Sequence, residues 1–510
     1  MYDGVLSLPN FKNPEIPHIL SIKNPTAEQI SLTLKALRNS IYDGVFAHLF
    51  ANLTGSMFLP AFALVLGASA VEIGVLAAAP FFATVVQFFG AFLVEKYNQR
   101  KRMVIVFALL SRIVWLVVIA ASLLLSLDKP AVLLLILILV VLSHHALASI
   151  TSIAWLSWMS VLVPDEIRGR FFGLRNATLG AFNIALTLLA GRFLDWHKLH
   201  YPDSAPTQPF DWLFTVAVFC GLLSVIFLVR KPAPPRHVYA EKITTGDLYK
   251  LPLLNISFRR LAWFAAFWSV GVKIASPFFI VYMLQVLHFD YSFIAILIVS
   301  SAFADMAGMW MWGQFSDRLG NKPVVVISGV FISVIPMLWF ISSPDLPHVH
   351  LLIIVLHLVS GFFWAGFNLC SVNLVFAIAP KERNTGYFAH WAAFNGVASG
   401  IGAILGGLAF EYAPNLFMSL QLSAEAGFKS IFIISAALRF ASLLLLKNVT
   451  DPRGKKTMRA IRILRNVKTW AGLMGFDGIL HYFLPAKKPK KQNGRSPYWP
   501  IWRFGRSKSQ

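Results

Sequence analysis

The segment Gly313-Gln-Phe-Ser-Asp-Arg-Leu-Gly-Asn-Lys-Pro323 lies between two long apolar stretches, and a degenerate copy of it occurs earlier in the chain. The copy, Ala91-Phe-Leu-Val-Glu-Lys-Tyr-Asn-Gln-Arg-Lys101, begins 222 residues earlier and is also flanked by apolar stretches. The corresponding positions are Asp317-Arg318 and Glu95-Lys96, Gly320 and Asn98, and Lys322 and Arg100. A short charged turn that recurs at about half the chain length indicates a duplicated bundle of membrane helices.

A second pair of loops repeats at nearly the same distance. The stretch Val163-Pro-Asp-Glu-Ile-Arg-Gly-Arg-Phe-Phe-Gly173 aligns with Ala379-Pro-Lys-Glu-Arg-Asn-Thr-Gly-Tyr-Phe-Ala389. The shared positions are Pro164 and Pro380, Glu166 and Glu382, and Phe172 and Phe388, all at an offset of 216. Two loop repeats at similar offsets predict a chain built from two related halves of six spans each.

The composition places this duplicated chain in a membrane. Of the 510 residues, 57% are hydrophobic and 13% are charged, with a mean hydropathy of +0.66, whereas soluble domains have about 45–50% apolar and about 25% charged residues. Apolar runs of about 20 residues recur, each long enough to cross a hydrocarbon core of about 30 Å. The sequence therefore predicts an all-α polytopic membrane protein rather than a barrel of alternating strands. The expected spans are 42–67, 70–93, 103–126, 131–160, 171–195, 212–230, 260–286, 291–315, 323–343, 349–378, 385–412 and 427–447.

The distribution of basic residues predicts the topology. A net charge of +22 would suggest a nucleic-acid partner in a soluble protein, but here the lysines and arginines gather in alternate loops. Such an excess marks the cytoplasmic side. We therefore expect a multi-pass protein of the inner or plasma membrane with both termini in the cytoplasm and no nucleic-acid partner. The loops assigned to that side contain Arg100, Lys101, Arg102, Arg168, Arg170, Arg175, Arg230, Lys231, Arg236, Lys242, Lys250, Arg259, Arg260, Arg318, Lys322, Lys381 and Arg383.

The same reasoning divides the chain into five segments. They are a cytoplasmic N-terminal segment (1–40), a first six-helix bundle (41–230), a cytoplasmic linker (231–259), a second six-helix bundle (260–447) and a basic tail (448–510). In the tail, basic residues recur every third position from Arg459 to Lys468 beside an apolar stripe. This pattern predicts an amphipathic helix that binds anionic lipid headgroups, followed by disorder; a disordered basic tail throughout is the alternative.

The signature loop and the twelve-span layout resemble the major facilitator superfamily, over about residues 40–447. The stretch Trp155-Leu-Ser-Trp-Met159, with Pro164 and the basic run from Arg168 to Arg175, resembles a poorly characterised bacterial branch. The resemblance implies two pseudo-symmetric bundles that rock around a central site. It also implies a gating motif comprising Gly313, Asp317, Arg318, Gly320, Lys322, Glu95, Lys96, Arg100, Arg168 and Arg170.

In this motif, an acidic residue would bind the N-terminal turn of a helix in the other half, where free N–H groups favour negative charge. We expect Asp317 to engage the start of the fifth span near Arg168 and Arg170. Glu95 would engage the start of the eleventh span near Asn384 and Thr385. The alternative is that the charged loops only anchor the helix ends at the membrane surface.

Polar residues inside spans are candidates for the transport cavity, because burying them in a bilayer is unfavourable. The candidates are Lys273, Asp305, His144, His145, Asn52, Asn368 and His357, together with Trp364, which supplies an aromatic face. Lys273 and Asp305 lie on consecutive spans and could form either a coupling pair or a structural salt bridge. Arg112 and Arg439 are expected to snorkel or to pair helices, and Asp43 is expected to cap the first span.

Together these features predict a secondary active transporter that moves a small organic solute by alternating access, with proton coupling. Alternatives are a multidrug or amphiphile exporter, a facilitator, or a non-transporting sensor or scaffold that uses the tail. No nucleophile–base pair or metal-ligand spacing occurs in the sequence, so we expect no enzymatic activity, no metal and no cofactor. The expected partners are the solute, protons and membrane lipids, and the expected state is a monomer.

Overall fold

The computed structural model of the 510-residue chain describes residues 27–97, 99–125, 129–163, 167–233, 252–379, 384–416, 424–449 and 451. These residues form helices and turns, with no β-strand among them. Within the described residues, 12 helical segments are long and apolar enough to cross a membrane. The prediction of an all-α protein with twelve spans is therefore confirmed.

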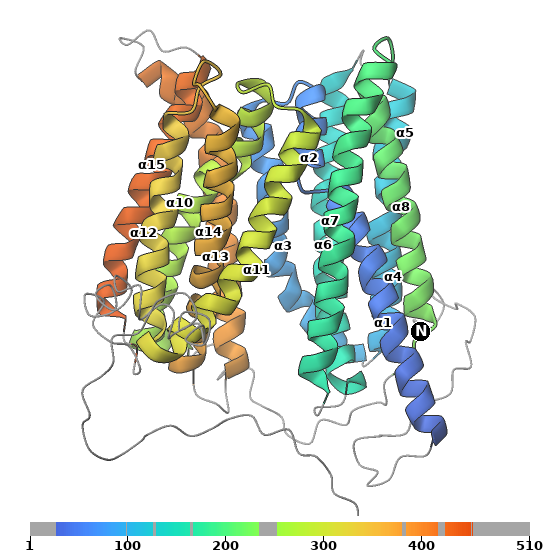
Figure 1. Ribbon diagram of the computed structural model, residues 1–510. Helices are drawn as coiled ribbons and strands as arrows, with labels where there is room; N and C mark the ends of the chain where they lie inside the picture. Colours follow the sequence, from blue (N-terminus) through green and yellow to red (C-terminus); the bar gives the residue numbers. More distant parts are fainter. Residues whose placement is uncertain are drawn as a thin grey trace, which may run out of the picture. The chain divides into compact units, whose positions relative to one another are not determined.

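The first half of the described chain contains the first six spans (Figure 1). Two of these spans are interrupted: the first consists of α1 and α2, and the third of α4 and α5. The helices are α1 (Ala27–Leu53), α2 (Phe58–Val65), α3 (Ala70–Tyr97), α4 (Arg100–Ile113), α5 (Trp115–Leu125), α6 (Pro130–Leu162), α7 (Arg168–His200) and α8 (Gln208–Val229).

The second half contains the other six spans, each a single helix. They are α10 (Ile256–Gln285), α11 (Tyr291–Leu319), α12 (Asn321–Phe340), α13 (Val349–Ile378), α14 (Asn384–Leu416) and α15 (Ala424–Leu445). A 3₁₀ turn, η5 (Leu446–Asn448), follows the last span. Most predicted boundaries agree with these helices to within a few residues, but the first helix begins well before the predicted residue 42.

The chain forms long helices because a bilayer offers no water to its backbone, so every N–H and C=O must be paired within the segment. The lipid-facing surfaces are apolar as well. Leucines on the outside of several helices are highly exposed, including Leu124 at 82%, Leu199 at 76% and Leu444 at 76%. In water such surfaces would aggregate, whereas in a bilayer they contact acyl chains.

The halves meet chiefly where α3 packs against α14 and where α7 packs against α11 (Figure 1), and α2 also contacts α10. Glycines of α14 allow this packing. A Cβ on Gly407 would lie 2.5 Å from the carbonyl oxygen of Ala70 on α3, and one on Gly402 would lie 2.8 Å from Val270 on α10. The glycine-rich eleventh span therefore serves close helix packing on both of its sides.

Several predicted segments lie outside the described residues: the amphipathic tail helix, most of the linker and most of the N-terminal segment. The chain divides into two units, 1–457 and 458–510, and the helices described above belong to the first.

Candidate functional site

A cavity of about 710 Å³ lies within the second bundle. Its walls come from α10, α12, α13, α14 and α15. Four of the residues that the sequence singled out lie in its wall, namely Lys273, His357, Trp364 and Asn368. The other four candidates, Asp305, His144, His145 and Asn52, are not among the lining residues. The volume falls within the range of about 300–1,000 Å³ that is typical of small-molecule sites.

The structure does not bring Lys273 and Asp305 together. The Lys273 ammonium lies 4.6 Å from the centroid of the Phe81 ring on α3. Asp305 is half-buried on α11 and forms no ion pair with any described residue. The two helices are consecutive in the sequence, but α10 packs chiefly against α14 and α15, whereas α11 packs against α13 and α7. Sequence proximity of the two spans was therefore a poor guide to contact.

Arg439 is the second cation of the cavity wall, and the sequence analysis expected it only to snorkel or to pair helices. Its side chain is 3% exposed, and one amino group donates a hydrogen bond to the carbonyl of Ile332 at 3.0 Å. This bond does join α15 to α12. The guanidinium Nε, however, has no partner among the protein atoms, although the residue lines the cavity.

Neutral polar groups complete the wall. The Nδ1 of His357, which lines the cavity, donates to the carbonyl of Ile353 at 2.9 Å. The Ser269 hydroxyl donates to the side-chain oxygen of Asn395 at 2.9 Å. Six aromatic residues also line the cavity, and two of them, Trp268 and Phe367, stack with ring centroids 4.2 Å apart. The cavity therefore combines polar donors with large apolar faces.

The three polar candidates of the first bundle occupy its packed interior. The Nδ1 of His144 contacts the carbonyl of Ser111 at 2.8 Å, and its ring lies 5.2 Å from that of Phe50 and 4.9 Å from that of His145. The Asn52 amide donates to the Thr187 hydroxyl at 3.0 Å. The contacts of His144 and Asn52 join helices of the first bundle, whereas the half-buried His145 contacts His144, its neighbour in the chain.

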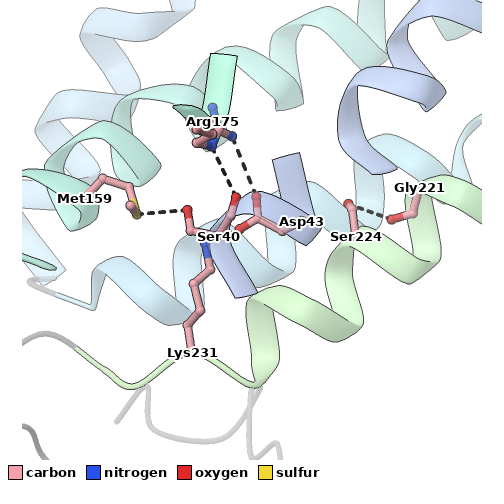
Figure 2. A network of polar contacts seen from close by, with 7 residues as sticks. All are labelled: Ser40, Asp43, Met159, Arg175, Gly221, Ser224 and Lys231. Atoms are coloured by element: carbon pink, nitrogen blue, oxygen red, sulfur yellow. Dashed lines mark hydrogen bonds and ion pairs between the residues drawn. The ribbon is translucent and has the colours of Figure 1, made fainter. Parts of the chain in front are cut away.

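A buried ion cluster lies in the first bundle at the end of α8 (Figure 2). The Lys231 ammonium donates to one carboxylate oxygen of Asp43, and Arg175 Nη2 lies 3.9 Å from the other. The exposed fractions of the side chains are 0% for Lys231, 5% for Asp43 and 10% for Arg175. Burial lowers the pKa of the Lys231 ammonium, and the Asp43 carboxylate opposes this change.

The expectation that Asp43 caps the first span is wrong. The helix begins at Ala27, so Asp43 lies in its interior, where its carboxylate meets two cations instead of backbone N–H groups. Gly44 makes room for one of them, because a Cβ there would lie 2.5 Å from the Arg175 guanidinium. The first span was predicted to begin at residue 42 because apolar residues dominate only from there.

The tryptophans of the Trp155–Met159 stretch cover this cluster. The Arg175 guanidinium lies 4.6 Å from the Trp155 ring centroid, and the Lys231 ammonium lies 5.0 Å from that of Trp158. Aromatic faces attract cations through their quadrupole, most strongly where water is excluded. The stretch that resembled a bacterial branch thus helps to stabilise a buried ion cluster that joins α1, α7 and the segment after α8.

The signature loop forms a sharp turn between α11 and α12. Gly320 occupies it with a φ of 89°, a backbone conformation that a side chain would strain. Lys322 fixes the chain after the last span: its ammonium donates to the carbonyls of Lys447 at 3.1 Å and Val449 at 2.7 Å. Its backbone N–H donates to the Asp451 carboxylate at 2.8 Å.

The gate contacts expected of the signature motif are not formed by the described residues. Asp317 and Arg318 are exposed, and no described residue bonds the Asp317 carboxylate. Arg170 is exposed too, while the side chains of Glu95 and Arg168 lie outside the described residues. Arg100 is buried and donates to the carbonyl of Ser157 at 3.5 Å, and Lys96 lies 5.4 Å from the Tyr97 ring.

A contact that the sequence analysis missed joins the halves where α7 ends and α11 begins. The Asp195 carboxylate of α7 accepts hydrogen bonds from the backbone N–H groups of Tyr291 at 3.0 Å and Ser292 at 2.7 Å, and from the Ser292 hydroxyl. It thereby caps α11, whose own N-cap residue, Asp290, makes no such bond. Asp195 lies near the C-terminal end of its own helix, where the helix dipole disfavours a negative charge. This unfavourable position is the sequence feature that could have indicated a partner on another helix.

Comparisons with known proteins agree with this architecture. The Major Facilitator Superfamily profile matches residues 44–272 and 261–486, and the chain belongs to this family. A solved D-xylose-proton symporter is 14% identical with a TM-score of 0.61, covering 84% of this chain and 99% of that one. The nucleoside transporter NupG is 17% identical with a TM-score of 0.60, covering 82% and 99%.

The xylose transporter XylE from E. coli, in an inward open conformation, is 14% identical with a TM-score of 0.56, covering 85% of this chain and 99% of that one. A comparison with curated proteins gave no match. At these identities the solved structures establish the fold alone. The chain is thus a multi-pass membrane transporter of the superfamily, and its cavity has to be interpreted from its own residues.

Proposed function

We propose that the protein is a secondary active transporter that moves a small organic solute through the membrane by alternating access. The observation that carries the proposal is the cavity of about 710 Å³, which lies inside a twelve-span fold and is lined by both polar and aromatic groups. Such a mixture binds an organic molecule at its polar and its apolar parts. The D-xylose-proton symporter and the nucleoside transporter share this fold and, by their descriptions, carry organic solutes.

The contacts between the halves support the rocking motion. The Asp195 cap on α11 and the approach of Gly407 to Ala70 lie at the end that the charge asymmetry predicts to be extracellular. At the opposite end Asp317 is exposed, and no described residue bonds its carboxylate. This pattern fits a state that is closed on the outer side and open towards the cytoplasm. Asp317 would engage the other half only after the bundles rock into the alternate state.

Proton coupling, as expected from the sequence, would use His357. Histidine changes its charge near neutral pH, and His357 belongs to the cavity wall. The charged groups of that wall are Lys273 and Arg439, so a proton on His357 would add to an existing positive charge. Asp305 is a less suitable proton site because it lies outside the lining residues.

Reconstitution into proteoliposomes tests the proposal. The purified chain should move a solute that raises its thermal stability, and an imposed pH gradient should drive accumulation above the equilibrium level. Replacing His357 with Gln should abolish the response to the pH gradient while leaving solute exchange intact. Stable protein that binds a solute but catalyses neither net flux nor exchange would refute the transport function and favour a sensor.

A further inference from the structure

Among the described residues, the wall of the cavity in the second bundle contains two cations and no acid. Lys273 and Arg439 lie in its wall, and none of the lining residues is an aspartate or a glutamate. The helices that carry them touch at this level, since a Cβ on Gly271 would lie 3.1 Å from the backbone nitrogen of Arg439. The ion pairs among the described residues involve Asp43 and Glu425, neither of which lines the cavity.

Two like charges in a low-dielectric wall repel each other and lose hydration, so leaving both uncompensated is unfavourable. The neighbours that the structure provides offset this only in part. Lys273 lies over the Phe81 ring, and Arg439 has the single carbonyl of Ile332. Both cations would gain most from an anion that entered the cavity.

Other residues of the wall also have polar atoms without partners. The buried Nε of Arg439, the indole Nε1 of Trp268 and the hydroxyl of Ser371 have no hydrogen-bond partner, and all three residues line the cavity. These atoms are inaccessible to solvent, and residues outside the cavity, such as Trp115 and Trp158, also have unpaired polar atoms, so the two cations carry the argument for a ligand. The planar fork of an arginine matches the oxygens of a carboxylate or a phosphate.

The aromatic residues of the wall determine which apolar group the ligand can carry. Trp339, Trp364 and Trp391 surround the cavity together with the stacked pair of Trp268 and Phe367. Aromatic faces of this kind pack against planar apolar groups. The wall therefore combines the two cations, Lys273 and Arg439, with neutral polar groups and large aromatic faces.

We infer that the cavity binds an organic anion, with its carboxylate or phosphate group at Lys273 and Arg439 and its planar apolar body against the tryptophans. The inference rests on the transport function proposed above and names the substrate class of the same site. It also assigns Arg439 a direct role in binding, which its position in the last span did not suggest.

Isosteric probes test the charge requirement. Naphthalene-2-carboxylate should raise the melting temperature of the detergent-purified full-length chain, whereas naphthalene-2-carboxamide, which has the same shape and no charge, should not. 2-Naphthyl phosphate distinguishes phosphate from carboxylate recognition, and inorganic phosphate tests whether the apolar body contributes. If the carboxamide stabilises the chain as much as the anions, or if neither naphthyl anion stabilises it, the proposal is overturned. Equal stabilisation by inorganic phosphate overturns the assignment of the tryptophan wall.

Substitutions of the two cations test whether they bind the anion. Lys273→Gln and Arg439→Gln should each weaken binding of the effective anion on the order of 10- to 100-fold, because each removes a charge-assisted contact. Arg439→Lys keeps the charge but loses the fork, so its effect should be smaller, and it remains informative if Arg439→Gln fails to fold. Lys429→Gln is the matched control, since Lys429 pairs with Glu425 outside the cavity. Unchanged affinity in folded Lys273→Gln overturns the proposal.

Flux measurements separate this proposal from the transport function. A chain that transports only neutral or cationic solutes would retain its function as a transporter and refute the anion site. A chain that binds the anions through Lys273 and Arg439 but moves nothing would retain the site and refute transport.

Discussion

Replacing Asp195 with Asn should release the contact that joins α7 to the start of α11. The carboxylate accepts bonds from two backbone N–H groups and one hydroxyl of the other half. In asparagine one oxygen becomes an NH₂ group that faces these donors, so at least one charge-assisted bond is lost. Such a bond contributes about 1.5–3 kcal/mol, and a loss of about 2 kcal/mol lowers the equilibrium constant for closure about 30-fold.

Thiol labelling measures this shift. The two cysteines of the chain, Cys220 and Cys370, are buried and can be replaced first. A cysteine at Ala61, which is 1% exposed on α2 where that helix packs against α10 of the other half, then reports opening. A membrane-impermeant maleimide added to intact cells should react with it at least 10-fold faster in Asp195→Asn, as long as closure dominates in the unmodified chain.

The control is Asp203→Asn, which removes the same charge from an exposed loop position near the end of α7. It should leave the labelling rate within twofold of the parent. Ser292→Ala, which removes only the hydroxyl donor, should give an intermediate rate. Equal rates for the parent and Asp195→Asn would show that Asp195 does not hold this end closed.

Three further predictions address other parts of the chain. Lys231→Met leaves the buried Asp43 carboxylate with Arg175 alone and should destabilise the fold by up to about 3–5 kcal/mol. The melting temperature should fall, and adding Asp43→Asn should partly restore it. A double variant no more stable than Lys231→Met would contradict this prediction. Gly407→Val should lower the melting temperature strongly because the α3 backbone occupies the space, whereas Gly180→Val, with nothing within 4 Å, should not. Asp317→Asn should slow flux without changing the melting temperature by more than 1–2 °C, about 0.5 kcal/mol, because the exposed carboxylate has no partner among the described residues; a large stability loss would be inconsistent with it.

Span number and helix type followed from the sequence because hydrophobic length is a local property. Twelve apolar runs of sufficient length predict twelve helices whatever their packing, and the structure has them. The two eroded loop repeats likewise predicted two halves. Boundaries were less certain where polar residues continue a helix beyond the apolar run, as they do in α1 before residue 42.

Which charged side chains contact each other was less predictable from the sequence, because such contacts depend on helix rotation and on which helices are neighbours. Lys273 and Asp305 looked like partners from sequence proximity, yet their helices pack against different elements. Asp43, near an expected helix end, is instead the centre of an ion cluster with Lys231, which is 188 residues away along the chain. Intramembrane polarity identified Lys273, His357, Trp364 and Asn368 as candidates, and all four lie in one cavity wall.

Twelve spans in two related halves could be predicted from the amino-acid sequence, because apolar length and loop repeats are readable without knowing any contact. Only the tertiary structure decided which charges meet. It assembled Lys273 and Arg439, 166 residues apart, in one cavity without an acid, and it set Asp195 against the start of α11. Electrostatic function depends on distances of a few ångströms between groups far apart in the chain, and helix packing alone sets those distances.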